Sequence, residues 1–307
     1  MRAVVLACLA ALVCAGLARA SGVPVQVAAA GTVLWTASDA GLEVVDLDSG
    51  RIVASPRTTY PYATQAVVGG GAVWVASLTN GYLSGAVDRF DPRTRRRTTP
   101  LRFPTRAVYA IAFGGGALWA WFGSPTAAHA SLVVRIDALG HLRRLLRLHE
   151  RPGWMAATRS GVWLLDETSL RFVDGTSNHV VRIASVRATG PPAAGLGSVW
   201  VLANRGIVRF DERTRRERAR IRVAGTPILA AAGGGQLWAV TMRSMRARLL
   251  RIDAARGTIV RSRALPFIPT DMRLSDGRLW LGTGAPPAVD ALDPRSLRTL
   301  RRVPLGP

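Results

Sequence analysis

The chain has 307 residues, and 49% of them are hydrophobic, which is enough for the core of one large domain or two ordinary ones. It contains no lysine, so all 41 basic side chains are arginines, and with 19 acidic residues the net charge is +22. After the N-terminal segment no apolar run reaches the ~18 residues that a membrane-spanning helix needs, so no transmembrane segment is expected in the mature chain.

The N-terminal segment has the three parts of a secretory signal peptide. Arg2 is a short positive region, residues 4–17 are apolar, and Ala18-Arg19-Ala20 fits the small-x-small rule for cleavage. We therefore expect residues 1–20 to be a signal peptide and residues 21–307 to be secreted or held in the cell envelope or periplasm.

Both cysteines of the chain, Cys8 and Cys14, lie in that segment. The mature chain would then have neither a disulfide nor a thiol nucleophile. A lipid anchor at Cys14 is the weaker alternative, because Val13 stands where Gly or Ala is usual.

The rest of the chain consists of seven repeats. Each contains a tryptophan in the same phase, at intervals of roughly 40 residues, in segments such as GGGAVWVA and GGGQLWAV. The seven tryptophans are Trp35, Trp74, Trp119, Trp163, Trp200, Trp238 and Trp280. A second element follows each of them and ends in an aspartate: Asp48, Asp91, Asp137, Asp174, Asp211, Asp253 and Asp293.

Each repeat divides into four short strands. A strand of small residues, such as residues 65–68, is followed by a glycine turn, the tryptophan strand, the strand that ends in aspartate, and a last strand such as ERARIRV. That last strand alternates arginine with apolar residues, which indicates a half-buried strand. The aspartates fit tight turns better than metal sites, since Asp91-Pro92 suits the first two positions of a type I turn.

Four-stranded repeats of this length predict an all-β fold, a seven-bladed β-propeller with four antiparallel strands per blade. The tryptophans would fill the seams between blades. The expected blades are residues 23–64, 65–105, 106–152, 153–188, 189–225, 226–267 and 268–307. Because Val25 can begin a first strand and residues 297–304 can form a last one, the ring can close without exchanging a strand between the chain ends.

Blocks such as VAGTPILAAAGGGQLWAV, followed by LLRIDAARGTIV, resemble the YVTN-type repeat propellers of exported bacterial proteins. Virginiamycin B lyase-like propellers have a similar repeat style. The resemblance covers residues ~23–307 and implies the fold, but it is shared by proteins with different functions. The catalytic motif of the lyase does not map onto this chain residue by residue, so the resemblance carries no activity over.

Arginines concentrate at the turns into the outermost strands and on those strands, as in residues 93–97 and 213–222. Charges there oppose pairing between sheet edges. Binding to an acidic cell-envelope polymer is the alternative, through guanidinium contacts. Nucleic acid is not expected, because no aromatic residues interleave with these arginines and the chain carries an export signal.

The loops from fourth to first strands and from second to third strands share one face of a propeller, around the central channel. Here these loops are aromatic and varied, which suits a small molecule, a peptide or a protein partner. The candidate ligand-binding residues are Tyr60, Tyr62, Arg106, Tyr109, Trp121, Trp154, Phe267 and Asp271. The alternative is that these rings only pack the bases of the loops.

One cluster of acid–base residues could converge on the same face. Its members are His129, His149, Glu150, Asp166 and Glu167. Histidines with carboxylates could act as acid and base or hold a divalent metal, but none of them has a motif spacing. We therefore predict no metal and no cofactor.

The sequence favours a monomeric, exported, non-enzymatic propeller that binds a ligand or partner by its loop face. A lyase or hydrolase using the His129 cluster is the first alternative, and a basic module for acidic polymer is the second.

Overall fold

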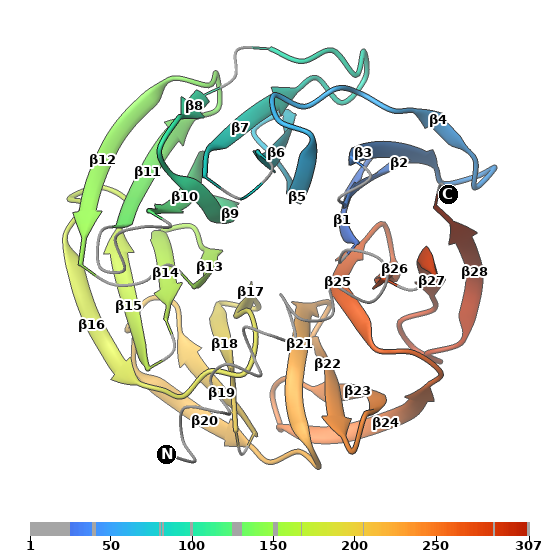
Figure 1. Cartoon of the computed structure of the whole chain (residues 1–307). Coiled ribbons are helices and arrows are strands. Elements are labelled where there is room, and N and C mark those ends of the chain that lie inside the picture. Colours follow the sequence, from blue (N-terminus) through green and yellow to red (C-terminus); the bar gives the residue numbers. More distant parts are fainter. Residues whose placement is uncertain are drawn as a thin grey trace.

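The computed structural model describes residues 25–38, 41–79, 81, 83–98, 101–124, 131–149, 153–166, 168–204, 206–284 and 286–305. These residues form seven four-stranded antiparallel sheets and no helix, so the predicted seven-bladed β-propeller is confirmed. The sheets stand around a central axis in the order of the sequence (Figure 1). No described segment is a helix long and apolar enough to cross a membrane.

The strands are named in chain order. Blades one to three consist of β1 Gln26–Ala30, β2 Val33–Ser38, β3 Gly41–Asp46, β4 Ile52–Ala54; β5 Tyr62–Gly69, β6 Ala72–Leu78, β7 Gly85–Phe90, β8 Leu101–Phe103; β9 Ala107–Gly114, β10 Ala117–Gly123, β11 Ser131–Asp137, β12 Leu142–Leu148. Blades four and five consist of β13 Trp154–Ala157, β14 Gly161–Leu165, β15 Ser169–Asp174, β16 Val180–Ser185; β17 Ala193–Gly195, β18 Ser198–Ala203, β19 Gly206–Asp211, β20 Glu217–Ile221. Blades six and seven consist of β21 Thr226–Gly233, β22 Gln236–Arg243, β23 Arg246–Asp253, β24 Thr258–Leu265; β25 Pro269–Ser275, β26 Arg278–Gly284, β27 Pro287–Leu292, β28 Thr299–Pro304.

The ring closes without strand exchange, a mode of closure that the sequence allowed but did not settle. The first sheet contains only β1–β4 and the last only β25–β28, so each end of the chain completes its own blade. Polar contacts link the two blades instead: the backbone N–H of Val27 donates to the carboxylate of Asp271 at 2.9 Å, and the Thr270 hydroxyl donates to the Val25 carbonyl at 3.0 Å. β5 begins at Tyr62, inside the range expected for the first blade.

The seven repeat tryptophans are all buried, and hydrophobic clusters join them to the next blade. Trp163 of β14, for example, packs with Val199 and Val201 of β18, and its ring centroid lies 6.2 Å from that of Phe210 on β19. Since a twisted sheet exposes an apolar face, this stacking of blades buries each face against its neighbour. These contacts confirm the prediction that the tryptophans fill the seams between blades.

The turn between the third and fourth strands has one construction in nearly every blade. At Asp91 the carboxylate accepts the backbone N–H groups of Arg93 and Thr94 at 2.9 and 2.6 Å, and Arg95 closes the turn with φ 61°. Equivalent carboxylate–backbone bonds are made by Asp137, Asp174, Asp211, Asp253 and Asp293. The predicted turn role is therefore confirmed for these six aspartates.

The first blade differs from the sequence prediction. Its turn aspartate is Asp46, whose carboxylate accepts the Ser49 backbone N–H at 2.7 Å, and not Asp48. The register shows why: Trp35 pairs with Val44, as Trp74 pairs with Arg89 two residues before Asp91. The prediction of Asp48 was wrong because DLD offers two aspartates and only the strand register distinguishes them.

These turns make stability depend on acid pH. Hydrogen bonds from the backbone and hydroxyl of Thr214, together with Arg218, lower the pKa of Asp211 to about 2. A carboxylate with a lowered pKa stabilises the fold above its unfolded pKa near 4, and that contribution disappears as pH falls toward the folded value. We expect Asp211→Asn to lose less stability than the wild type between pH ~4 and ~2.

Chemical denaturation at a series of pH values measures this difference. Asp276→Asn, at an exposed position outside the third-to-fourth turns, serves as the control and keeps the wild-type pH profile. Parallel profiles for wild type and Asp211→Asn would contradict the prediction.

Candidate functional site

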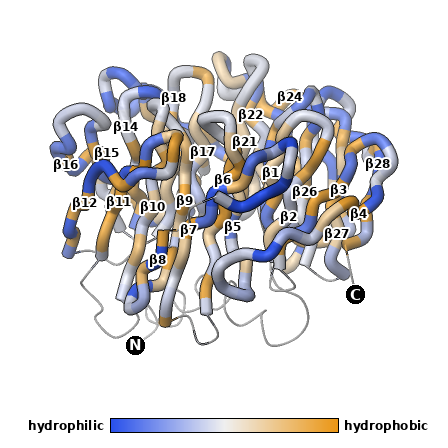
Figure 2. The backbone as a smooth tube through the Cα atoms, turned by 90° about the horizontal axis from the view of Figure 1, so that it is seen from above, coloured by the Kyte–Doolittle hydropathy of each residue, from blue (hydrophilic) through white to orange (hydrophobic). Residues whose placement is uncertain are grey.

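The connections from fourth to first strands and from second to third strands lie on one face of the ring, called here the loop face. This follows from the antiparallel order of each sheet, in which alternate connections fall on opposite ends. Figure 2 shows the strands side-on, with the connections gathered at the two faces.

Four of the predicted ligand-binding residues lie on the loop-face side of blades two and three. Tyr109 is 45% exposed, and it occupies a bulge of β9, the innermost strand of its blade. Tyr60, Tyr62 and Arg106 are partly exposed, and the ring of Tyr62 packs at the edge of the hydrophobic cluster between these two blades. The innermost strands β5 and β9 are tied together where the Ile111 N–H donates to the Gln65 side chain at 2.7 Å.

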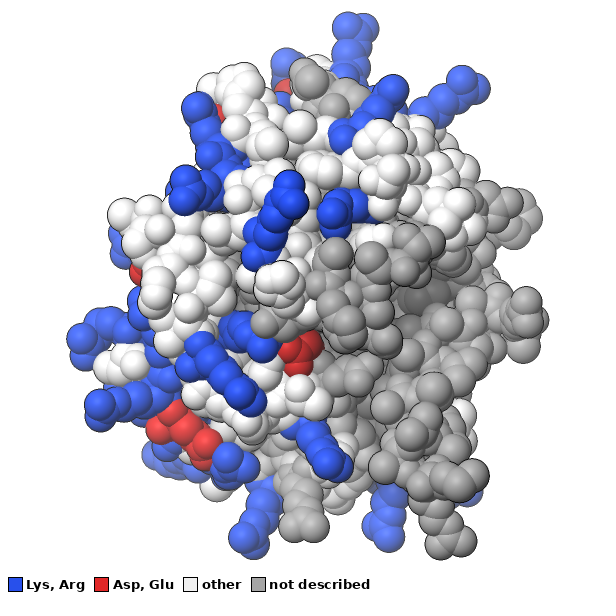
Figure 3. Space-filling model, turned by 60° about the vertical axis from the view of Figure 1, so that its left-hand side comes forward, with Lys and Arg blue, Asp and Glu red and all other residues white. Residues whose placement is uncertain are grey.

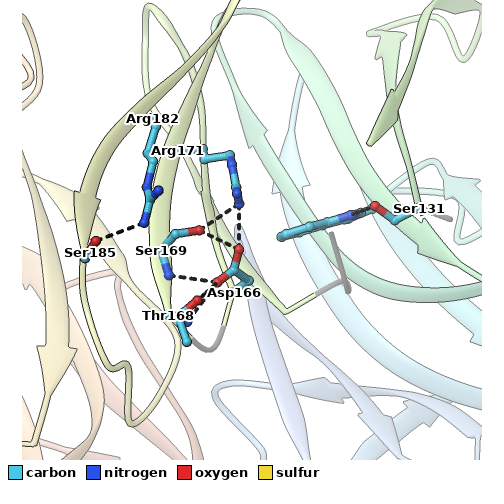
Figure 4. Close-up of polar contacts among 8 residues, drawn as sticks. Ser131, Asp166, Thr168, Ser169, Arg171, Arg182 and Ser185 are labelled. Atoms are coloured by element: carbon cyan, nitrogen blue, oxygen red, sulfur yellow. Dashed lines mark hydrogen bonds and ion pairs between the residues drawn. The ribbon is translucent and has the colours of Figure 1, made fainter. Parts of the chain in front are cut away.

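Of the other four candidates, two are buried and two are partly buried. Trp121 is a core residue, 1% exposed, whose indole N–H donates to the Ser131 hydroxyl at 3.0 Å (Figure 4). Asp271 is buried at the closure between blades seven and one, where it accepts the Val27 N–H. Trp154 and Phe267 are partly buried against hydrophobic clusters.

The predicted acid–base cluster is described only in part, since His129, Glu150 and Glu167 lie outside the described residues. His149 is exposed just after β12. Asp166 is buried and faces its own loop.

The carboxylate of Asp166 is surrounded by donors from the start of β15. It accepts the backbone N–H groups of Thr168 and Ser169 at 2.8 and 2.7 Å, the Ser169 hydroxyl at 2.5 Å, and the Arg171 guanidinium at 2.6 Å (Figure 4). Burial raises its pKa, but these bonds outweigh burial and hold the pKa of Asp166 below its usual value. Asp166 therefore shapes the connection between β14 and β15, and its lone pairs are largely used.

Metal binding has no support within the described ranges. No three His, Cys, Asp or Glu side chains there gather closely enough to hold a metal ion.

The arginines have a role that sequence reasoning missed. At every seam between blades, an arginine side chain bonds to the neighbouring blade. The donor–acceptor pairs are Arg95–Val53 carbonyl, Arg89–Ala138 carbonyl, Arg135–Gly175 carbonyl, Arg215–Asp174 carboxylate, Arg209–Ala254 carbonyl, Arg251–Arg295 carbonyl and Arg301–Leu47 carbonyl. Part of the positive charge is thus used to join the blades.

Four of these seam arginines share a position that the sequence displays. Each stands two residues before the turn aspartate, in the RFD and RID motifs: Arg89, Arg135, Arg209 and Arg251. Three of them also lie over the tryptophan of their own blade, with the guanidinium carbon 5.7 Å from the Trp74 ring, 5.6 Å from Trp119 and 5.0 Å from Trp200. A guanidinium on a tryptophan ring is a favourable cation–π pair.

Other arginines project from the outer surface. Figure 3 shows basic side chains spread over the face turned forward, with few acidic ones beside them. On β12, Arg143 pairs with Asp137, whereas the exposed side chains of Arg144 and Arg147 bond to no residue that the structure describes.

No protein-family profile matches the chain, and no curated protein sequence matches it. Solved structures do match it in fold. A computationally designed protein, Ika8, has a TM-score of 0.66 and 14% identity, with 92% of this chain and 86% of that one covered. The dihydro-heme d1 dehydrogenase NirN, solved in complex with DHE, has a TM-score of 0.61 and 13% identity, with 92% of this chain and 67% of that one covered. Hsv2 of Kluyvelomyces marxianus has a TM-score of 0.62 and 10% identity, with 92% of this chain and 99% of that one covered.

Identities at this level show the fold alone. The chain is a seven-bladed β-propeller, a fold found in proteins of unrelated function.

Proposed function

We propose that this protein is an exported, non-enzymatic β-propeller that binds a small ligand or partner through its loop face. The recurring tryptophan and aspartate segments favour the YVTN-type family of exported bacterial proteins, and the N-terminal segment favours export by a signal peptide. On this proposal the protein acts as a monomer, and binding needs no cofactor.

The observation that carries the proposal is the exposure of Tyr109. It is a large aromatic side chain, 45% exposed, on the innermost strand of blade three, whereas the repeat tryptophans are buried. Arg106, partly exposed, precedes the same strand. An exposed aromatic ring can stack on a ligand.

A lyase or hydrolase is the less favoured alternative. Of its two described residues, Asp166 is bonded to its own loop and His149 is exposed. A module for acidic polymer would have to use arginines outside the seams, such as Arg144 and Arg147.

A thermal-shift screen of small organic anions, sugars and short peptides tests the proposal. Compounds that stabilise the wild type should lose at least about tenfold in affinity with Tyr109→Ala, the loss of roughly 1.4 kcal/mol of contact. Leu139→Ala, which removes a 71% exposed side chain from a turn on the opposite face, is the matched control and keeps wild-type binding. Hits that bind Tyr109→Ala as tightly as wild type would place the binding surface elsewhere.

A further inference from the structure

Blades two and seven carry an aspartate at the same buried position of the third strand. Asp88 pairs with Val75 and Asp290 with Leu281, in each case the residue after the repeat tryptophan. Both strands read AVD at this point. The two carboxylates can therefore be compared directly within one molecule.

In blade two the carboxylate is satisfied by the chain itself. Asp88 accepts the backbone N–H of Thr59 at 2.8 Å, the Thr59 hydroxyl at 2.5 Å and the Ser77 hydroxyl at 3.2 Å. Arg97 adds an ion pair at 3.6 Å. A buried carboxylate needs such donors, because an unpaired buried charge is costly.

In blade seven the same donors are missing. The register places Thr283 where blade two has Ser77, since Thr283 pairs with Pro269 as Ser77 pairs with Ala63. Leu265 stands four residues before Pro269, as Thr59 stands four before Ala63, and it offers no side-chain donor. The Thr283 hydroxyl is directed to the carbonyls of Pro286 and Ala288, at 3.0 and 3.3 Å. Asp290 is only 4% exposed, yet its Oδ1 accepts no hydrogen bond from any residue that the structure describes.

A cavity of about 190 Å³ lies beside Asp290, between the outer strands of blades six and seven. Its lining combines the carboxylate with two guanidinium groups and apolar side chains: Asp290, Arg263, Arg302, Leu265, Phe267 and Leu292.

Both arginines are held by other contacts, and neither donates a hydrogen bond to Asp290 Oδ1. Arg302 lies over the Phe267 ring, with its guanidinium carbon 5.5 Å from the centroid, and its Nη1 is 3.7 Å from Asp290 Oδ1. Arg263 donates to the Leu297 carbonyl at 2.5 Å and the Thr299 hydroxyl at 3.0 Å. Burial raises the pKa of Asp290, and the two arginines oppose that rise.

We propose that this cavity binds a small apolar α-amino acid as its zwitterion. The ammonium pairs with the carboxylate of Asp290, as the N–H and hydroxyl of Thr59 bond to the carboxylate of Asp88 in blade two. The carboxylate pairs with Arg302 and Arg263, and the side chain packs on Leu265 and Leu292. A zwitterionic apolar amino acid complements the carboxylate, the two guanidinium groups and the apolar side chains that line the cavity. This site is separate from the one proposed around Tyr109.

Isothermal titration calorimetry of the protein with L-valine tests the site. We expect binding by the wild type, and at least about tenfold weaker binding by Asp290→Asn and by Arg302→Met, because each removes a charged partner. Asp276→Asn, with the same change in charge outside the cavity, keeps wild-type affinity. Arg302→Met also keeps the test decisive if Asp290→Asn fails to fold.

Two analogues separate the ligand's charges. Isobutylamine lacks the carboxylate and 2-hydroxyisovalerate lacks the ammonium, so both should bind at least about tenfold more weakly than L-valine. The absence of heat with L-valine at up to about 10 mM, where even a Kd near 1 mM gives near-saturation, would overturn the proposal. Equal affinity in Asp290→Asn, or for 2-hydroxyisovalerate, would overturn it too. Tyr109→Ala should leave L-valine binding unchanged, so failure of one site is distinguished from failure of the other.

Discussion

Replacing Trp200 with alanine lowers the free energy of unfolding by about 3–5 kcal/mol, the range for truncating a large buried aromatic residue. The side chain is 0% exposed and fills the seam between blades five and six, where it packs with Leu237 and Ile252. Its indole N–H donates to the Gly195 carbonyl at 3.3 Å, and Arg209 lies over its ring. Alanine would leave a cavity and remove the ring on which Arg209 lies.

Guanidinium denaturation followed by circular dichroism measures this loss. Leu300→Ala is the control, since that side chain is 58% exposed on the outer strand β28 and its removal should change stability by no more than about 0.5 kcal/mol. A loss below about 1 kcal/mol for Trp200→Ala would contradict the role of the tryptophans as seam residues.

The architecture could be predicted because its signals are local and repeated. The phase of Trp74 or Trp238 needs no knowledge of neighbouring blades, and the Asp-led turn is specified by short-range hydrogen bonds such as that from Thr94 to Asp91. Because both markers recur in all seven repeats, a chance match to the pattern could be excluded. The prediction that Asp48 forms the turn of the first blade was wrong, because two aspartates there fit the local pattern.

The seam arginines could not be predicted in the same way. Arg89 bonds to the carbonyl of Ala138 in the next blade, and no short-range pattern tells that an arginine on a strand points across a seam. Its recurrence two residues before the turn aspartate was visible, but its partner was not. The interpretation of the arginines as a charged outer edge therefore left out this structural use.

The candidate site was predicted least well, because burial is a property of the assembled ring. Trp121 was a predicted ligand-binding residue, yet it is buried beside Ser131. The sequence did not single out Asp290, since the missing hydrogen bond to its Oδ1 depends on which side chains the assembled blades place around it. Only the comparison with Asp88 reveals it.

Replacing Arg301 with alanine is expected to lower the free energy of unfolding by about 2–3 kcal/mol, because charged hydrogen bonds at the ring closure are lost. Its guanidinium donates to the carbonyls of Leu47, Asp48 and Ser49, at 3.1, 2.5 and 2.7 Å. Gly50 leaves room for it: a Cβ there would lie 2.8 Å from the guanidinium carbon. No strand crosses this seam, so side-chain contacts must hold the last blade to the first.

The free energy of unfolding of Arg301→Ala, measured beside that of Arg144→Ala, decides whether arginine bridges hold the ring closed. The Arg144 side chain is exposed on β12 and bonds to none of the described residues, so its removal takes away the same charge without a bridge. We predict a loss of about 2–3 kcal/mol for Arg301→Ala and a change within about 0.5 kcal/mol for Arg144→Ala. Equal small changes in both variants would show that the arginines contribute charge and no closure.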